Sequence, residues 1–81
     1  MKITGNKGYV DIERDGDVAR FYGDLCTKGF EAIASTMEWL TNVRSVKEEE
    51  RLELMCAVRE HLKKNKFKVF FTDERGKRLK F

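Results

Sequence analysis

A two-residue turn near the start of the chain places the tightest limit on its fold. Asp15-Gly16 lies between residues 8–14 and 17–23, two runs in which apolar and polar residues alternate. Both central positions of a type I′ turn need positive φ, which an Asp-Gly pair supplies at low cost. The sequence therefore predicts an antiparallel hairpin in which Arg14 lies opposite Asp17.

This turn predicts the whole register of the hairpin. The expected opposite pairs are Ile12 with Ala19, Asp11 with Arg20, Val10 with Phe21, and Tyr9 with Tyr22. Because side chains alternate between the two faces of a strand, one face collects Val10, Ile12, Ala19 and Phe21. We expect that face to be core. The other face carries the charge pair and the aromatic pair, and we expect it to contact solvent.

Residues 45–65 have the pattern of one long amphipathic helix. Ser45 and Glu48 have the spacing of a capping box, and Asn65 suits the left-handed residue that ends a helix. At about 100° per residue, the expected apolar arc contains Leu52, Met55, Cys56, Val58 and Leu62, with Leu54 on its flank. A helix with one apolar side needs a surface to pack against.

Residues 67–72 are rich in aromatic and β-branched residues, which predicts a central strand. Phe67, Val69 and Phe71 would face the core. A three-residue loop at 74–76, with Gly76 in the left-handed position, would then give a C-terminal hairpin. Its expected pairs are Asp73 with Lys77, Phe71 with Leu79, and Val69 with Phe81.

The segment 29–41 is ambiguous. Phe30, Ile33, Met37 and Leu40 recur at helical spacing, which favours a helix, whereas the short run 30–34 also suits a strand. Both interpretations remain open on the residues alone.

Together these elements predict an α+β fold, in which a small antiparallel β-sheet packs against one long α-helix. The sheet would contain the N-terminal hairpin, an uncertain middle strand and a C-terminal strand or hairpin. We expect residues 1–81 to form a single domain, with its core at about 4–72 and a basic C-terminal hairpin at 67–81. Because a domain of this size buries a limited core, a homodimer or a bound partner would be unsurprising.

The cysteines and the hydropathy pattern bear on the cellular compartment in which the protein works. Cys26 and Cys56 are too far apart in sequence for a Cys-x-x-Cys motif, and we expect two reduced thiols, with a disulfide as the alternative. No apolar run approaches the roughly 18 residues of a membrane span. We therefore expect a cytoplasmic protein that has no membrane partner.

Residues that carry catalysis or bind metal are sparse. His61 is the only histidine and has no cysteine or second histidine at ligand spacing. The acidic run 48–50 is explained by the positive end of the helix dipole. We therefore expect no enzyme activity, no cofactor and no metal site.

The net charge of +3 is unevenly distributed, because residues 63–81 carry eight Lys or Arg against two Asp or Glu. Aromatic residues are interleaved with these charges, namely Phe67, Phe70, Phe71 and Phe81. Basic and aromatic side chains on a sheet are typical of domains that bind single-stranded nucleic acid. A small nucleic-acid-binding domain is therefore the alternative functional prediction.

Several short motifs together resemble bacterial immunity protein 74, a family of immunity proteins in polymorphic toxin systems. They are Gly8-Tyr9-Val10-x-Ile12, the Asp15-Gly16 turn, Gly23-Asp24, Gly29-Phe30, the single Trp39, the long helix and the final Phe-x-Val-Phe-Phe strand. The similarity covers roughly residues 4–72. It implies extended chain across the ambiguous segment, with a strand at 30–34 and a further short strand near 37–40.

The resemblance implies a function by stoichiometric binding, in which the protein covers or distorts a cognate toxin. Rigid aromatic residues beside paired charges suit such an interface. The candidate partner-binding residues are Tyr9, Asp11, Arg20, Tyr22 and Trp39. For the four hairpin residues the alternative is ordinary cross-strand pairing at a surface, and for Trp39 it is a place in the core.

Overall fold

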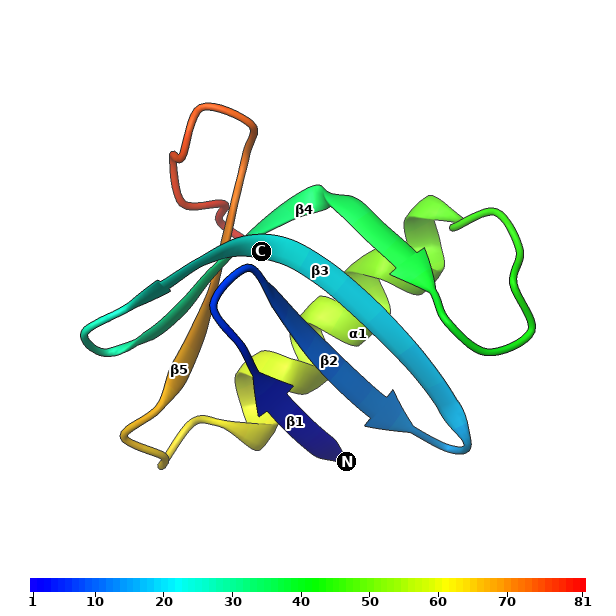
Figure 1. Cartoon of the computed structure of the whole chain (residues 1–81), viewed down its shortest axis with the longest axis horizontal. Helices are drawn as coiled ribbons and strands as arrows, with labels where there is room; N and C mark the ends of the chain where they lie inside the picture. The colour runs from blue at the N-terminus through cyan, green and yellow to red at the C-terminus, as the bar shows by residue number, and fades with distance from the viewer.

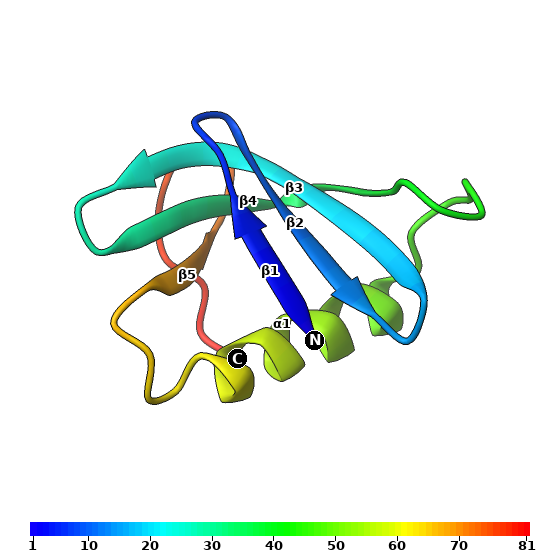
Figure 2. The same cartoon turned by 60° about the horizontal axis from the view of Figure 1, so that its bottom comes forward.

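The computed structural model describes residues 1–81 and contains one helix and a five-stranded sheet. The elements are β1 (Lys2–Gly5), β2 (Tyr9–Arg14), β3 (Asp17–Cys26), β4 (Gly29–Trp39), α1 (Glu48–His61) and β5 (Lys68–Thr72). The strands lie side by side in chain order, and the sheet is antiparallel except between β4 and β5. The sheet is curled, and α1 lies beneath its arch (Figures 1 and 2).

The predicted fold class, an α+β domain with a small antiparallel sheet packed against one long helix, is wrong. Strands contain 46% of the residues and the helix only 17%, so the chain is mostly β, with a sheet curled into a half-barrel. The sheet is also not purely antiparallel. Because α1 carries the chain back to the end of the sheet where β4 begins, β5 pairs with β4 in parallel.

The N-terminal hairpin is confirmed in turn and register. Asp15 and Gly16 both have positive φ, at 51° and 84°. All the expected pairs are present, from Arg14 with Asp17 to Tyr9 with Tyr22. The face predicted to be core is fully buried, and its members are Val10, Ile12, Ala19 and Phe21.

The ambiguous segment is one continuous strand, β4, so the helical alternative is wrong. Arg20 pairs with Glu38 and Tyr22 with Ile33, so residues 34–37 of β4 bulge opposite the single residue Phe21. Residues 30, 32 and 34 are buried in the first part of β4, and residues 37 and 39 in the last part. The three-residue step from 34 to 37 shows that the bulge breaks the period-2 alternation. The interrupted alternation produces apolar spacings that resemble those of a helix.

Helix α1 is shorter than predicted at both ends. It begins at Glu48 with Lys47 as the N-cap residue, so the Ser45 capping box is wrong. The Lys47 backbone N–H donates to the Glu50 carboxylate at 3.3 Å. The preceding residue, Val46, packs against the core, which holds the chain outside the helix at this point.

The C-terminal end of α1 is set by a side chain from the next strand. The helix ends at His61 rather than Asn65. Lys68 Nζ donates to the backbone carbonyls of Leu62 and Lys63, both at 2.7 Å, and so satisfies acceptors that the end of a helix leaves unpaired.

The buried face of α1 differs from the predicted arc at two positions. Met55, Val58 and Leu62 are buried as expected, but so is Leu54, which was expected on the flank. Leu52 is 51% exposed, so its assignment to the core is wrong.

Strand β5 is the last strand of the sheet and not a central one. Val69 and Phe71 are buried, whereas Phe67 precedes the strand and is 37% exposed, with its ring against Gly5. The predicted turn at 74–76 is present, with Gly76 at φ 86° and the Asp73 N–H donating to the Lys77 carbonyl at 2.8 Å.

The hairpin after this turn is incomplete. The Leu79 N–H donates to the Phe71 carbonyl at 2.8 Å, and Thr72 forms an isolated bridge with Arg78. This is the predicted register, but no sixth strand forms and the pairing of Val69 with Phe81 is absent.

The core is one cluster of 15 buried residues from the concave side of the sheet and from α1. The rings of Phe21 and Phe71 meet edge to face with their centroids 5.1 Å apart, which joins the N-terminal hairpin to β5. Both cysteines are free, as predicted.

The close approach of β3 and β4 gives a first test of this fold. A Cβ at Gly23 would lie 1.8 Å from the Glu31 carbonyl oxygen. We expect Gly23→Ala to lower the free energy of unfolding by about 1–3 kcal/mol, because the strands must separate to admit the methyl group. Urea unfolding measures the change. The matched control is Gly8→Ala, where no atom lies within 4 Å of the added Cβ; equal midpoints for the two variants would contradict the β3–β4 pairing described here.

Candidate functional site

Four of the predicted site residues meet on the outer, convex face of the β2–β3 hairpin. The cross-strand pairs Asp11/Arg20 and Tyr9/Tyr22 are adjacent there. The Arg20 guanidinium donates two hydrogen bonds to the Asp11 carboxylate, from Nε at 2.7 Å and from Nη2 at 2.9 Å. Arg20 Cζ also lies 3.7 Å from the centre of the Tyr9 ring. We call these four residues the hairpin patch.

The hairpin patch is held rigidly before any partner binds. Two parallel bonds fix both the position and the plane of the guanidinium, and the ring beneath it adds a cation–π contact. The hydrogen bond to Asp11 is the main reason that the pKa of Arg20 is raised, against the opposing effect of desolvation. Asn6 Nδ2 donates to the Tyr9 hydroxyl at 3.1 Å, which orients that ring.

The bulge in β4 supports the patch from the neighbouring strand. The Tyr22 backbone N–H donates to Thr36 Oγ1 at 2.9 Å, next to the point where the register of β3 with β4 shifts. The same hydroxyl donates to the Ile33 carbonyl at 2.6 Å. Thr36 therefore joins the strands where the ladder is interrupted, and the Tyr22 side chain remains 37% exposed on the outer face.

Acidic residues that sequence reasoning missed surround the patch. The strand pairings and the alternation along each strand place four of them on the same face: Glu13, Asp24, Glu31 and Glu38. None of the four forms an ion pair, whereas Asp11 is neutralised by Arg20. The outer face therefore carries an excess of negative charge on a chain whose net charge is +3, although Lys2 of β1 lies opposite Glu13. Placing Glu31 and Glu38 required the register of β3 with β4, which the bulge hides from the sequence. The alternation of the hairpin strands could have placed Glu13 and Asp24.

The fifth candidate, Trp39, does not belong to the patch. It is only 9% exposed, pairs with Ala19 and faces the core. Arg44 Cζ covers its ring at 4.2 Å from the centre. The Trp39 Nε1 is buried without a hydrogen-bond partner. The structure thus places Trp39 in the core, which was one of its two predicted places.

Arg44 links the Trp39 ring to the start of α1. Its Nη2 lies 3.2 Å from Glu50 Oε2 and 3.9 Å from Asp17 Oδ2. Desolvation alone would raise the pKa of Glu50, but the hydrogen bonds from Arg44 and from the Lys47 backbone outweigh it and lower the pKa. Ionised Glu50 therefore stabilises the folded state.

Residues that could bind a metal do not form a group in this structure. His61 is exposed at the end of α1. No group of three or more His, Cys, Asp or Glu side chains is placed to hold a metal ion. The helix of this chain is too short and too polar to cross a membrane.

The aromatic residues considered for nucleic-acid binding are dispersed. Phe71 is buried, Phe81 is half-buried against it with ring centroids 5.9 Å apart, and Arg78 covers the Phe70 ring at 3.9 Å. Only Phe67 presents a substantially exposed ring. These rings do not form the continuous stacking surface on which bases are usually held.

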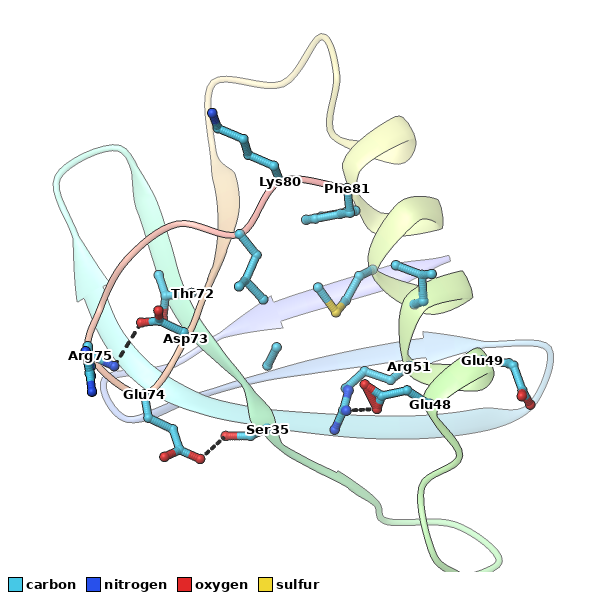
Figure 3. A pocket seen from close by; sticks show the side chains of 14 residues that line it. Ser35, Glu48, Glu49, Arg51, Thr72, Asp73, Glu74, Arg75, Lys80 and Phe81 are labelled. Atoms are coloured by element: carbon cyan, nitrogen blue, oxygen red, sulfur yellow. Dashed lines mark hydrogen bonds and ion pairs between the residues drawn. The ribbon is translucent and has the colours of Figure 1, made fainter.

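The largest hollow lies away from the hairpin patch. It has a volume of about 730 Å³ and lies between the start of α1, β4 and residues 72–81 (Figure 3). The exposed side chains of Leu52 and Leu79 line it. Ion pairing between Arg51 and Glu48 and a 3.2 Å hydrogen bond from Ser35 to Glu74 border it.

The chain matches no known protein family, no curated protein and no solved structure in the three comparisons made. The resemblance to the immunity proteins therefore stays a prediction.

The Arg44–Glu50 contact predicts a specific pH dependence. The folded-state pKa of Glu50 lies below its ordinary value, so its stabilising effect is present above the ordinary pKa and is lost as pH falls through the folded-state pKa. We expect Glu50→Gln to destabilise the protein near neutral pH and to match the wild type once Glu50 is protonated. Unfolding by urea from about pH 7 to pH 3 measures this difference. Glu49→Gln is the control, because Glu49 has no ion-pair partner; a difference that stays constant with pH would refute the assignment.

Proposed function

We propose that this protein is a non-enzymatic binding protein, similar to the immunity proteins of polymorphic toxin systems, and that it neutralises a cognate toxin by stoichiometric binding. The main support for the proposal is the hairpin patch, in which contacts within the sheet hold the Arg20 guanidinium and the Tyr9 ring in place. Such a surface loses little conformational freedom on binding, and that loss is one of the main costs of association.

The composition of the outer face supports a protein partner. Tyrosine and arginine are enriched where interfaces derive most of their binding energy. Tyr22 and Tyr9 lie beside a neutralised charge pair, at the centre of a surface whose rim is acidic. Complementarity of charge therefore favours a toxin that presents a basic surface to this face.

The cytoplasm is the compartment that we propose for this activity. Free thiols at Cys26 and Cys56 suit a reducing environment. An immunity protein also acts where it meets the toxin before the toxin damages the producing cell.

The alternative of nucleic-acid binding has one observation in its favour. Eight basic residues lie in the stretch 63–81. The covered rings of Phe70 and Phe71 weaken it. Toxin binding accounts for the rigid hairpin patch, which nucleic-acid binding leaves unexplained.

The two tyrosines of the patch provide the direct test. The reading frame next to this gene should encode the toxin. Co-expression of this protein with the toxic domain should restore the growth of cells that the domain alone inhibits. We expect Tyr9→Ala combined with Tyr22→Ala to weaken binding by at least about thirtyfold, because the two interface tyrosines together should contribute roughly 2 kcal/mol or more. Calorimetric titration with the purified toxin domain measures the change. Leu40→Ala combined with Val43→Ala is the control, since both residues are exposed in the loop before α1. Equal losses of affinity in the two double variants would show that the hairpin patch does not contact the toxin.

Salt dependence separates the two functions. Contacts with several phosphates make affinity fall by orders of magnitude between about 50 and 200 mM salt. We expect binding to the toxin domain to change much less over that range, because the Arg20–Asp11 pair is satisfied within the protein. We expect binding to a single-stranded oligonucleotide to be weak at both salt concentrations. Fluorescence anisotropy measures both interactions, and tight oligonucleotide binding at about 50 mM salt that falls by orders of magnitude at about 200 mM would favour the alternative.

A further inference from the structure

The free edge of β5 is only partly covered. The Lys68 N–H donates to the Lys28 carbonyl at 3.0 Å, so Lys68 points toward β4. Since successive residues of a strand direct their backbone groups to opposite sides, Val69 and Phe71 point away from β4. The Leu79 N–H donates to the Phe71 carbonyl, but residues 80–81 make no backbone bond to β5. The N–H and C=O of Val69 therefore lie on an edge to which no strand is added.

The 77–81 segment, which covers the rest of this edge, is held by few contacts. Its last side chain, Phe81, packs edge to face on Phe71 at 5.9 Å between centroids. Arg59 of α1 lies 4.6 Å from the centre of the Phe81 ring and donates to the Phe81 carbonyl oxygen. Apart from its bonds to Phe71 and Asp73, the segment has no other backbone bond.

Hollows border the 77–81 segment on both sides. The larger, of about 730 Å³, lies toward the start of α1, and Figure 3 shows Phe81 beside the helix among the residues that line it. A second, of about 520 Å³, lies toward the end of α1. Leu79 and Phe81 line both hollows. If this segment moved away, the two hollows would join into one groove between α1 and β5.

The second hollow combines an apolar lining with positive charge. Its apolar lining residues are Leu62, Val69, Phe70, Phe71, Leu79 and Phe81. Its charged residues are four cations, Arg59, Lys63, Lys68 and Arg78, against the single acid Glu60. An occupant that suits this second hollow carries apolar groups and negative charge. The larger hollow, lined by four acids and three cations, has no such preference.

We propose that the groove between α1 and the free edge of β5 binds an extended acidic peptide segment, which adds to β5 as an antiparallel strand and displaces residues 80–81. Its backbone pairs with Val69 and extends the register that Leu79 begins. Its alternate side chains are apolar, and one of them fills the place of Phe81 beside Leu79, while acidic residues between them face the cations of the hollow. Strand addition to an exposed sheet edge is a general mode of peptide recognition.

Charge and backbone chemistry distinguish this occupant from others. A second copy of the chain would bring its own basic strand, including Lys68, against Lys63 and Arg78, which repels. A nucleic acid carries negative charge but has no backbone that continues a β-ladder. The site is separate from the hairpin patch, so it does not depend on the proposed toxin.

The experiment uses the full chain and a short fluorescent peptide that alternates glutamate with leucine. Anisotropy measures binding, and amide exchange followed by NMR reports on individual N–H groups. We expect saturable binding and a selective slowing of exchange at Val69. The decisive control is the same peptide with alternate backbone nitrogens methylated on its pairing edge, which keeps charge and composition but cannot form the ladder. Equal binding of the methylated peptide, or an unchanged Val69 exchange rate, would overturn the proposal.

Variants separate displacement from charge attraction. We expect Phe81→Ala to tighten peptide binding by about threefold to tenfold, because it raises the fraction of molecules whose groove is open. Lys63→Glu should weaken binding by about tenfold, whereas Lys7→Glu, the same change in the β1–β2 turn, should leave it unaltered. An unchanged affinity in Phe81→Ala molecules that unfold cooperatively, or equal effects of the two charge reversals, would count against the site. Slowing of Val69 exchange by an oligonucleotide, or by dimerisation alone, would also refute it.

Discussion

Burial of one continuous apolar surface, shared by the concave side of the sheet and one side of α1, is the interaction on which the rest of the molecule depends. Val10 and Phe21 from the hairpin, and Val58 from the helix, are completely buried in it. A shift of one residue in the β2–β3 register would turn every one of the hairpin's core residues outward. With the concave side occupied by α1, the surfaces left for binding are the convex face and the edges of the sheet.

Those two surfaces differ in charge and in rigidity. The convex face carries more acidic than basic residues, and its Arg20 is held by Asp11 and Tyr9. The edge beside β5 is basic and incompletely paired, with hollows on both sides of the 77–81 segment. A small positive net charge conceals this division. A rigid face suits recognition by shape and charge, whereas an open edge suits an extended chain that supplies the missing hydrogen bonds.

Features of the fold and of the hairpin patch were predictable from the sequence where they depend on residues close together in the chain. The hairpin and its patch depend on a local turn, so Asp15-Gly16 sufficed to pair Asp11 with Arg20. The bulge in β4 depends on a neighbouring strand, since the Thr36 hydroxyl bonds to Tyr22 of β3 where the register shifts. It disturbed the alternation of apolar residues and made the strand resemble a helix. The positions of Glu31 and Glu38 remained hidden for the same reason.

The sequence by itself determined the elements whose signals lie within a few residues: the type I′ turn, the faces of the hairpin, the turn at Gly76 and the apolar character of α1. Tertiary structure alone decided where α1 begins and ends, that Leu52 is exposed, and that β5 joins β4 in parallel at the edge of a curled sheet. The physical reason is that these features depend on contacts between residues far apart in the sequence, such as the pairing of Phe30 in β4 with Val69 in β5. Local propensity carries no information about such contacts, because they form only when the sheet closes over the helix.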